Sequence, residues 1–225
     1  NVSIYLDKFY SYEELEKIRE EILKSKNIDG IWINNIGEYY IFKDDNLKIN
    51  ADIGLNIFNR DAVKFFEDLG LSSITLSPEL NAAQIREISK EKTEFNLISY
   101  GRVPVMTMDH CPYSVIKGCV NIKNCPSCMF KNYYLRDGKD VDFEVLRQNT
   151  FTEIFNSYPI LFDRYLEEVK GKNINFLILA DEFTDEVVDL YKDFSNDKYE
   201  SLKNKLTKKY GQVTKGHINR GIISD

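Results

Sequence analysis

Short β-branched and aromatic runs alternate along this chain with stretches of amphipathic spacing, and this alternation limits the possible folds more than any other feature. Strands that alternate with helices favour a parallel sheet joined by crossover helices. The runs typical of buried strands are residues 2–6, 31–33, 48–55, 73–76, 94–100 and 173–180. The stretches that predict helices are residues 11–23, 62–69, 81–88, 159–169 and 184–194, followed by a lysine-rich helix around residues 203–209.

A closed (β/α)₈ barrel needs eight strand–helix units, and the sequence supplies only six strands. We therefore expect an α/β fold, a TIM-barrel-like (β/α) domain that is incomplete, with a four-cysteine loop and an irregular C-terminal tail. Within this one domain, residues 1–110 would form the βα units of the barrel, residues 111–135 the cysteine-rich metal or cluster loop, and residues 136–225 the last βα unit and the tail.

The two ends of the chain carry further expectations. Asn1 opens directly into a strand-like run without a methionine, so we expect that an N-terminal part of the same protein is missing and acts as a partner of the barrel. An open sheet exposes unpaired backbone groups along its edge. The tail from Gly211 to Asp225, or a second copy of the chain in a homo-oligomer, is expected to cover that edge.

The composition excludes some classes of protein. Of 225 residues, 43% are hydrophobic and 29% are charged, as in soluble globular proteins. The net charge of -6 argues against a general phosphate-binding surface, although the lysine-rich segment 203–215 could contact RNA phosphates. A solvated helix face is the more frequent explanation of such a segment. No apolar run approaches the ~18 residues of a membrane span and no signal peptide is visible, so we expect a cytoplasmic protein without membrane contact.

All four cysteines fall in one short stretch with the spacing C-x7-C-x5-C-x2-C; they are Cys111, Cys119, Cys125 and Cys128. Thiolates grouped so closely are most simply explained as ligands of one metal centre, because a shared cation lowers the pKa of each thiol. A structural zinc site usually has two short cysteine pairs, and only one is present, whereas a four-iron four-sulfur cluster tolerates irregular spacing. Disulfides are a third possibility, which a reducing compartment disfavours. We expect the four-iron four-sulfur cluster, with zinc as the alternative.

Polar residues follow the expected strands, where barrel enzymes collect their chemistry. They are Asn34, Asn56, Ser77, Glu79, Arg102, Asp181 and Glu182. We expect Asn56, Glu79, Arg102 and His110 to open onto one shared substrate-binding cavity. Arg102 could fork onto the carboxylate of a small organic donor, because its guanidinium is planar, or it could pair with Asp109 or Glu79.

Little in the sequence builds a peptidase. A nucleophilic mechanism needs a nucleophile, a base and an orienting group, and the only histidines are His110 and His217. A zinc protease would need H-E-x-x-H on a helix, which is absent. Asp181 and Glu182 are neighbours in an expected strand, so they would face opposite sides. Catalytic residues therefore stay unassigned.

Several motifs, in order, resemble a known family. They are Asn56 and Asn59 after a strand, LSPEL from Leu76, YGRVPVM from Tyr100, DHCP from Asp109, TEIFNS from Thr152 and TKGHINRG from Thr214. From about residue 48 to the end, the sequence is similar to the collagenase-like peptidase family of unknown catalytic type, peptidase family U32. The sequence departs from the family in Asp109, where relatives more often have glutamate, and in the seven-residue gap between its first two cysteines.

The resemblance implies an incomplete TIM-type barrel and an iron–sulfur cluster on the four cysteines. Relatives with such a cluster take part in oxygen-independent hydroxylation of RNA bases or of a quinone precursor, so an RNA or a small aromatic compound is the implied substrate. The closing motif adds His217 and Arg220 as substrate-binding candidates. The alternatives are a true peptidase, as the family name says, or a non-catalytic binding module held together by its metal.

Overall fold

The computed structural model describes residues 2–91, 93–119, 132–147, 151–163 and 174–219. The chain forms two compact units. Unit 1 comprises Asn1–Ser99, Phe162–Ile178 and Lys215–Asp225, and unit 2 comprises Tyr100–Leu161 and Leu179–Thr214. The chain first passes from unit 1 to unit 2 within one strand, after Ser99. The domain boundaries expected near residues 110 and 135 stay a prediction.

Unit 1 is built from alternating strands and helices. In chain order they are β1 (Ser3–Tyr5), α1 (Tyr12–Lys24), β2 (Gly30–Ile33), α2 (Ile36–Phe42), β3 (Lys48–Ala51), the 3₁₀ helix η1 (Ile53–Leu55), α3 (Arg60–Asp68), β4 (Ser73–Thr75), α4 (Ala82–Ile88), the first part of β5 (Glu94–Gly101) and β11 (Ile174–Ile178). Strands β1 to β5 pair in sequence order, all in parallel, and β11 pairs with β5.

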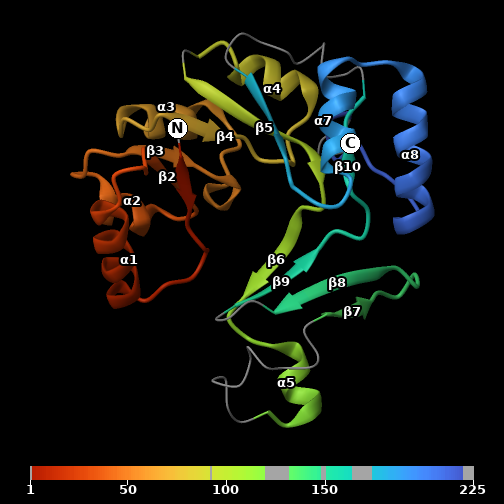
Figure 1. Cartoon of the computed structure of the whole chain (residues 1–225), viewed down its shortest axis with the longest axis horizontal. Coiled ribbons are helices and arrows are strands. Elements are labelled where there is room, and N and C mark those ends of the chain that lie inside the picture. The colour runs from red at the N-terminus through yellow and green to blue at the C-terminus, as the bar shows by residue number, and fades with distance from the viewer. Residues whose placement is uncertain (1, 92, 120–131, 148–150, 164–173, 220–225) are drawn as a thin grey trace. The chain divides into compact units, whose positions relative to one another are not determined.

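The parallel sheet of unit 1 is curled, and helices α1 to α4 lie along its outer side (Figure 1). A mixed α/β fold with a curled parallel sheet, as in part of a barrel, is therefore confirmed. A closed TIM barrel and the four-cysteine loop stay predictions.

Alternating residues of each strand divide between the two faces of this sheet. One face is apolar and packs against the helices. Its buried side chains are Ile31, Ile33, Ile49, Ala51, Ile74, Leu76, Phe95 and Leu97, and those of the helices are Leu15, Ile22, Phe42, Val63, Phe66, Ile85 and Ile88. This burial supplies the hydrophobic core of unit 1.

Local capping fixes where several of these helices begin. Ser11 and Glu14 form the capping box that the sequence predicts for α1, since each side chain accepts from the backbone of the other. Asn81 caps α4 in the same way with Gln84. The sequence left residues 37–43 unassigned, and the structure shows helix α2 there, begun by a third capping box on Asn35.

Two expected elements differ from the structure. The strand expected over residues 48–55 ends at Ala51, because Asp52 starts the 3₁₀ helix η1. The helix expected over 159–169 is wrong at its start, where β10 (Ile160–Leu161) pairs antiparallel with the end of β5 in unit 2. The rest of that expected helix, from residue 164, lies outside the described residues.

Unit 2 contains an antiparallel sheet that the sequence does not predict. Its strands are β6 (Pro104–Met108), β7 (Asn132–Arg136), β8 (Asp142–Arg147) and β9 (Thr152–Phe155), in the order β6-β9-β8-β7, with α5 (Pro112–Lys117) after β6. A register shift between Pro104 and Met106 interrupts the pairing of β6 with β9. The strands are short and mostly half-exposed, so they lack the continuous apolar runs that mark the strands of unit 1.

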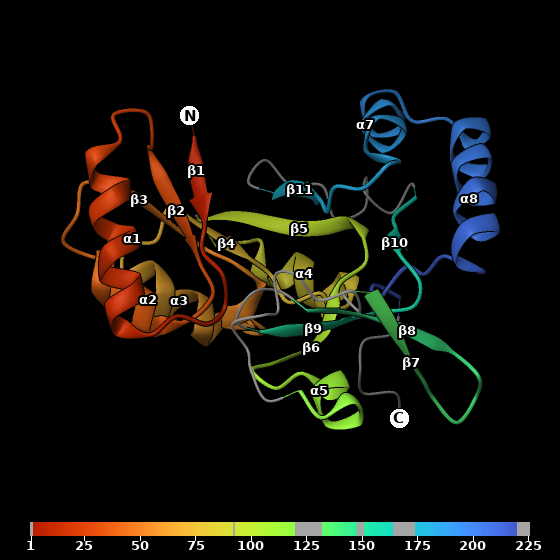
Figure 2. The same cartoon turned by 60° about the horizontal axis from the view of Figure 1, so that its bottom comes forward.

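Two helices of unit 2, α7 (Thr184–Lys192) and α8 (Asn196–Tyr210), lie side by side in both views (Figures 1 and 2). Lysines of α8 pair with acidic residues of α7 or of the turn before it: Lys205 with Glu186 at 2.6 Å, Lys198 with Asp189 at 3.1 Å and Lys209 with Glu182. These pairs favour a charge-balanced helix face over a phosphate-binding one. Among the helices of the described residues, none combines the length and apolar character needed to cross a membrane.

The C-terminal tail is irregular over its described part. In unit 2, Thr214 bridges Ile160 of β10, and its carbonyl accepts the Leu161 amide at 2.9 Å. In unit 1, the Ile218 carbonyl accepts the Ala82 amide at 2.8 Å, and Ile218 is buried. The tail thus makes one bridge to β10, while its covering of the open edge of the sheet stays a prediction and residues 220–225 lie outside the described part.

We predict that Gly54→Ala destabilises unit 1. A Cβ atom at Gly54 would lie 2.5 Å from the Asn34 carbonyl oxygen and 2.7 Å from its Oδ1, closer than such atoms approach. Overpacking of this kind typically costs about 1–3 kcal/mol. Gly138→Ala is the control, because a Cβ atom there would meet nothing within 4 Å. Urea unfolding followed by the fluorescence of Trp32, the single tryptophan, measures the effect; equal stability of the two variants would contradict the packing described.

Candidate functional site

Unit 1 carries a row of buried polar side chains across four neighbouring strands. Thr75 pairs in register with Asn96. Ile33, Ala51 and Ile74 are also aligned in register. The residues that follow them, which are Asn34, Asp52 and Thr75, are therefore aligned as well. All four polar residues are buried. Because they alternate with the apolar set, they face away from the helices. Asn34, Asp52 and Thr75 also lie at the ends of their strands, where parallel barrels hold their ligands.

A second polar row lies next to the first and is joined to it by hydrogen bonds. Ser73 donates to Asn50 Oδ1 at 2.8 Å and accepts from Asn96 Nδ2 at 3.1 Å. Asn50 Nδ2 donates to the Ile31 carbonyl at 3.1 Å, and Asn175 Nδ2 donates to Asn96 Oδ1 at 3.4 Å. A buried polar network is tolerated when its members are hydrogen-bonded, and these are.

The Tyr5 hydroxyl forms a separate hydrogen-bonded group with Asp52 of the first row. It donates to Asp52 Oδ2 at 2.7 Å, while Asn34 Nδ2 donates to the Leu6 carbonyl at 2.8 Å. Burial raises the pKa of Asp52, and the hydrogen bond from Tyr5 partly offsets that effect. The nearby Thr75 hydroxyl has a smaller effect, which also lowers the pKa of Asp52. This hydroxyl is buried and makes no hydrogen bond of regular geometry within the described chain.

Glu38 is the second buried carboxylate near these strand ends. It accepts from the Asn34 amide at 2.6 Å and from Asn35 Nδ2 at 2.7 Å, and it is only 2% exposed. Burial raises its pKa to about 6 despite these hydrogen bonds. The contacts with Asn35 complete the cap of α2, so the carboxylate has a structural role that explains its position.

We predict that Glu38 makes unit 1 less stable as the pH rises. Its folded-state pKa is raised, so its stabilising contribution is present below about 4.5 and is lost as the pH passes about 6. The loss corresponds to about 2 kcal/mol in the free energy of unfolding. Glu38→Gln should remove this component, measured as the difference from wild type in urea unfolding followed by Trp32 fluorescence between pH ~4 and ~7.5.

Glu13→Gln is the matched control for this titration, because Glu13 is an exposed carboxylate on α1. The control should leave the pH dependence of stability unchanged. A wild-type protein and a Glu38→Gln variant with parallel stability curves across this range would show that burial does not perturb the Glu38 carboxyl.

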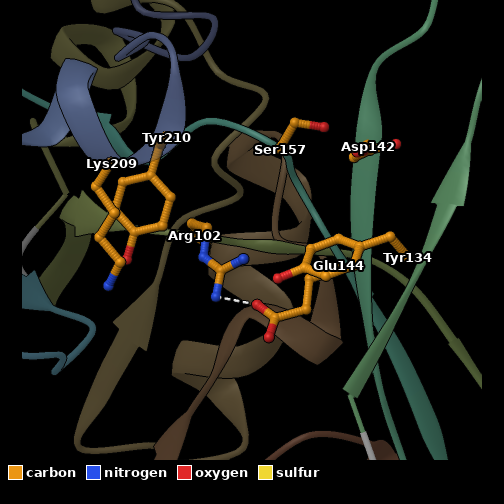
Figure 3. Close-up of a pocket in the computed structure, with 7 residues that line it drawn as sticks. All are labelled: Arg102, Tyr134, Asp142, Glu144, Ser157, Lys209 and Tyr210. Carbon is orange, nitrogen blue, oxygen red and sulfur yellow. Dashed lines mark ion pairs between the residues drawn. The ribbon is translucent and has the colours of Figure 1, made fainter.

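Unit 2 contains a cavity of about 300 Å³ (Figure 3). It is lined by Arg102, Tyr134, Asp142, Glu144, Ser157, Lys209 and Tyr210. Figure 3 shows Arg102 in the middle, with the end of α8 on one side and strands β7 and β8 on the other. Five separate segments of unit 2 therefore build this cavity, and Arg102 is the one lining residue that the sequence marked as a substrate-binding candidate.

The Arg102 side chain is fixed within the cavity by three partners. Its guanidinium forms an ion pair with Glu144 and lies 5.3 Å from the ring centroid of Tyr210 and 5.8 Å from that of Phe155. Contacts of a guanidinium with aromatic faces add to the attraction of the ion pair. Glu144, which no sequence pattern marks, takes the place of the expected partners Asp109 and Glu79.

The other charges of the cavity are also balanced. Arg136 makes two hydrogen bonds to Asp142, from Nε to Oδ1 at 2.6 Å and from Nη2 to Oδ2 at 2.8 Å. Lys209 forms an ion pair with Glu182. The Oγ atom of Ser157 is buried without a hydrogen-bond partner in the described chain. The cavity is therefore lined by paired charges and by the aromatic rings of Tyr134 and Tyr210.

The acidic pair at residues 181 and 182 lies in a turn rather than in the expected strand. Asp181 accepts from the Tyr100 hydroxyl at 2.8 Å, and burial, with this carboxylate, raises the pKa of Tyr100 far above its ordinary value. Glu182 instead pairs with Lys209. The two carboxylates thus have separate partners, so they do not form a catalytic pair.

The first two cysteines flank a short helix of unit 2. Cys111 is the residue before α5 and is half-buried, whereas Cys119 follows the Gly118 that ends α5 and is exposed. The Cys111 sulfur lies 3.7 Å from the Tyr133 hydroxyl. Cys125 and Cys128 lie outside the described residues, within which no group of three or more His, Cys, Asp and Glu side chains could hold a metal ion. The convergence of four sulfurs stays a prediction.

The remaining predicted residues are distributed over both units. Asn56, in the left-handed conformation, and Glu79 are exposed in unit 1, where His217 is half-buried. His110 is exposed in unit 2 and does not line the cavity around Arg102; strand β6 separates the two along the chain. Arg220 lies outside the described residues. One cavity shared by all of these residues stays a prediction.

Sequence analysis missed Asp52 and Thr75, although a signal was present. Each is a polar residue inside a predicted strand, and the structure places Asp52 directly after β3 and Thr75 at the end of β4. Tyr5 could not be found in this way, because its role depends on a hydroxyl that reaches Asp52 from another strand. The cavity residues on β7 and β8 were missed along with the antiparallel sheet itself.

Comparison with known proteins adds a family. Residues 1–224 match peptidase family U32, which extends the likeness upstream of residue 48, where the motifs begin. No curated protein sequence matches the chain at a significant level. The solved structure of the U32 peptidase Mk0906 is similar, with 13% sequence identity and a TM-score of 0.46 over 80% of this chain and 70% of that chain.

Proposed function

The chain belongs to peptidase family U32, and from this membership we propose that it is an iron–sulfur enzyme. Cys111, Cys119, Cys125 and Cys128 would hold a four-iron four-sulfur cluster. The proposed reaction is an oxygen-independent hydroxylation of an RNA base or a small aromatic compound. Such a cluster, when bound, supplies one-electron transfer.

The donor set carries this proposal. Cysteine thiolates are the usual ligands of iron–sulfur clusters, and every cysteine of the chain lies in this one segment. Neither Cys111 nor Cys119 forms a disulfide in the described part of the chain, so both thiols are available. Cys111 and Cys119 flank α5, a helix about 9 Å long, and each would contribute one thiolate to the cluster.

We place the substrate in the cavity of unit 2. Its volume of about 300 Å³ is at the small end for ligand sites, which suits one base or one aromatic ring. Tyr134 and Tyr210 provide aromatic rings on which such a ring could stack. The charges of this cavity are already paired, so an uncharged ring fits it better than an anion.

A hydroxylation of this kind needs more than the chain provides. It replaces a C–H bond with a C–OH bond, using oxygen from water or from an organic donor. When water supplies the oxygen, two electrons leave the substrate for an external acceptor. The residues of the cavity would hold the ring and exclude water, which is the contribution that the described side chains can make.

We predict that anaerobically purified protein, reconstituted with iron and sulfide, binds about four iron and four sulfide per chain. Replacing each cysteine in turn by serine should remove more than half of the bound iron. Ser127→Ala is the matched control, because Ser127 lies between Cys125 and Cys128 and has no thiol. Metal analysis, sulfide analysis and the spectrum of the reduced protein measure the result. About one zinc ion per chain, with no iron, would overturn the proposal.

We also predict that the protein does not cleave casein or denatured collagen. In the described chain, the unused Ser157 hydroxyl has no hydrogen-bond partner and therefore no base to activate it. The test is incubation with each substrate in the presence and absence of added metal ions. Cleavage that disappears on replacing His110 or His217 by alanine would restore the peptidase interpretation; Glu13→Gln is a surface control that should change nothing.

A further inference from the structure

We infer that the hydroxyl of Tyr133 donates a hydrogen bond to the sulfur of Cys111 and holds that sulfur in place as a metal ligand. The inference rests on the proposed function only in requiring that the cysteines bind a metal centre. Tyr133 is then a positioning residue on β7, 22 positions along the chain from Cys111. No cysteine spacing or family motif points to it.

The direction of this hydrogen bond follows from the other partner of the hydroxyl. The Tyr133 oxygen accepts the Tyr113 amide at 3.3 Å, and the Cys111 sulfur lies 3.7 Å away. Because the Tyr133 oxygen accepts the Tyr113 amide hydrogen, the hydroxyl hydrogen of Tyr133 can be donated to the Cys111 sulfur. A metal-bound thiolate has no hydrogen to donate, so in the loaded protein the hydroxyl must be the donor.

Both partners are held from several sides. Tyr133 belongs to β7, where it pairs with Val145 of β8, and its ring centroid lies 5.1 Å from that of Tyr113. The segment that leads to Cys111 is held by Arg147, whose Nη1 donates to the Asp109 carbonyl at 2.8 Å. The sheet of unit 2 thus fixes the hydroxyl and the start of the cysteine segment independently.

A hydrogen bond onto a ligating sulfur has two consequences. It orients the sulfur before metal arrives, and loss of such outer partners typically costs about 10–100-fold in metal affinity. It also draws electron density from the sulfur, which favours the reduced form of a cluster and so raises its reduction potential. Both effects should depend on the Tyr133 hydroxyl alone, because the ring packs against Tyr113 without it.

The neighbouring residue, Tyr134, provides a matched control. Adjacent residues of a strand point to opposite faces. Tyr133 accordingly reaches Cys111, whereas Tyr134 lines the cavity with Glu144, its partner in register, and is 60% exposed. Tyr134→Phe removes the same atom from the same strand, on the face away from Cys111.

The experiment compares wild type, Tyr133→Phe and Tyr134→Phe after reconstitution under anaerobic conditions. The readouts are the rate of iron release to a chelator and the midpoint potential of the cluster. We expect Tyr133→Phe to release iron about tenfold faster or more and to have a lower potential, with Tyr134→Phe equal to wild type. Thermal unfolding of the three metal-free proteins checks that the sheet of unit 2 is intact.

The outcomes separate this inference from the proposed function. If wild type binds iron and sulfide but Tyr133→Phe matches it in release rate and potential, the inference is wrong and the proposed function stands. If wild type binds only zinc, the proposed function is wrong, and the zinc release rate of Tyr133→Phe then decides the inference by the same comparison. If all three proteins bind no metal, both are wrong.

Discussion

The register of the parallel strands is the constraint on which unit 1 depends. It aligns Ala51 with Ile33 and Ile74 on the face that packs against the helices, and it brings Asp52 and Thr75 together on the other face. A slip of one residue would exchange the two sets, burying polar side chains against the helices. The hydrogen bonds of Ser73 to Asn50 and to Asn96 require the same register. The apolar core and the polar strand ends are therefore two results of one pairing.

The sequence predicted the parts of the fold that local chemistry decides. The strands of unit 1 are apolar runs, and the capping box of Ser11 and Glu14 lies within four consecutive residues. The sequence therefore predicted these strands and the start of α1. The antiparallel sheet was not predicted. In a strand such as β8 only Val145 is fully buried, so the strand has no apolar pattern and depends on the strands that pair with it. Local signals fail where a strand depends on distant partners.

The same limit applied to the candidate sites. The spacing of the cysteines and the position of Arg102 after a strand marked these residues in the sequence. Neither pattern identifies the side chain that contacts Arg102 or Cys111. Glu144 is 42 positions from Arg102, and Tyr133 is 22 positions from Cys111. Their roles arise from the hairpin of β7 and β8, which presents Tyr133 on one face and Glu144 on the other. A site assembled by pairing of strands can be predicted only once the pairing is known.

The Arg102–Glu144 pair also bears on the kind of ligand proposed for the cavity. The Glu144 side chain is 17% exposed, so a ligand carboxylate that replaced it at Arg102 would leave a largely buried anion without its partner. Leaving a buried charged group unpaired costs about 1–3 kcal/mol or more. An organic acid would need a free guanidinium, but the Arg102 guanidinium is already paired with Glu144. The uncharged ring proposed as the ligand meets no such cost, because every ion pair of the cavity can stay intact beside it.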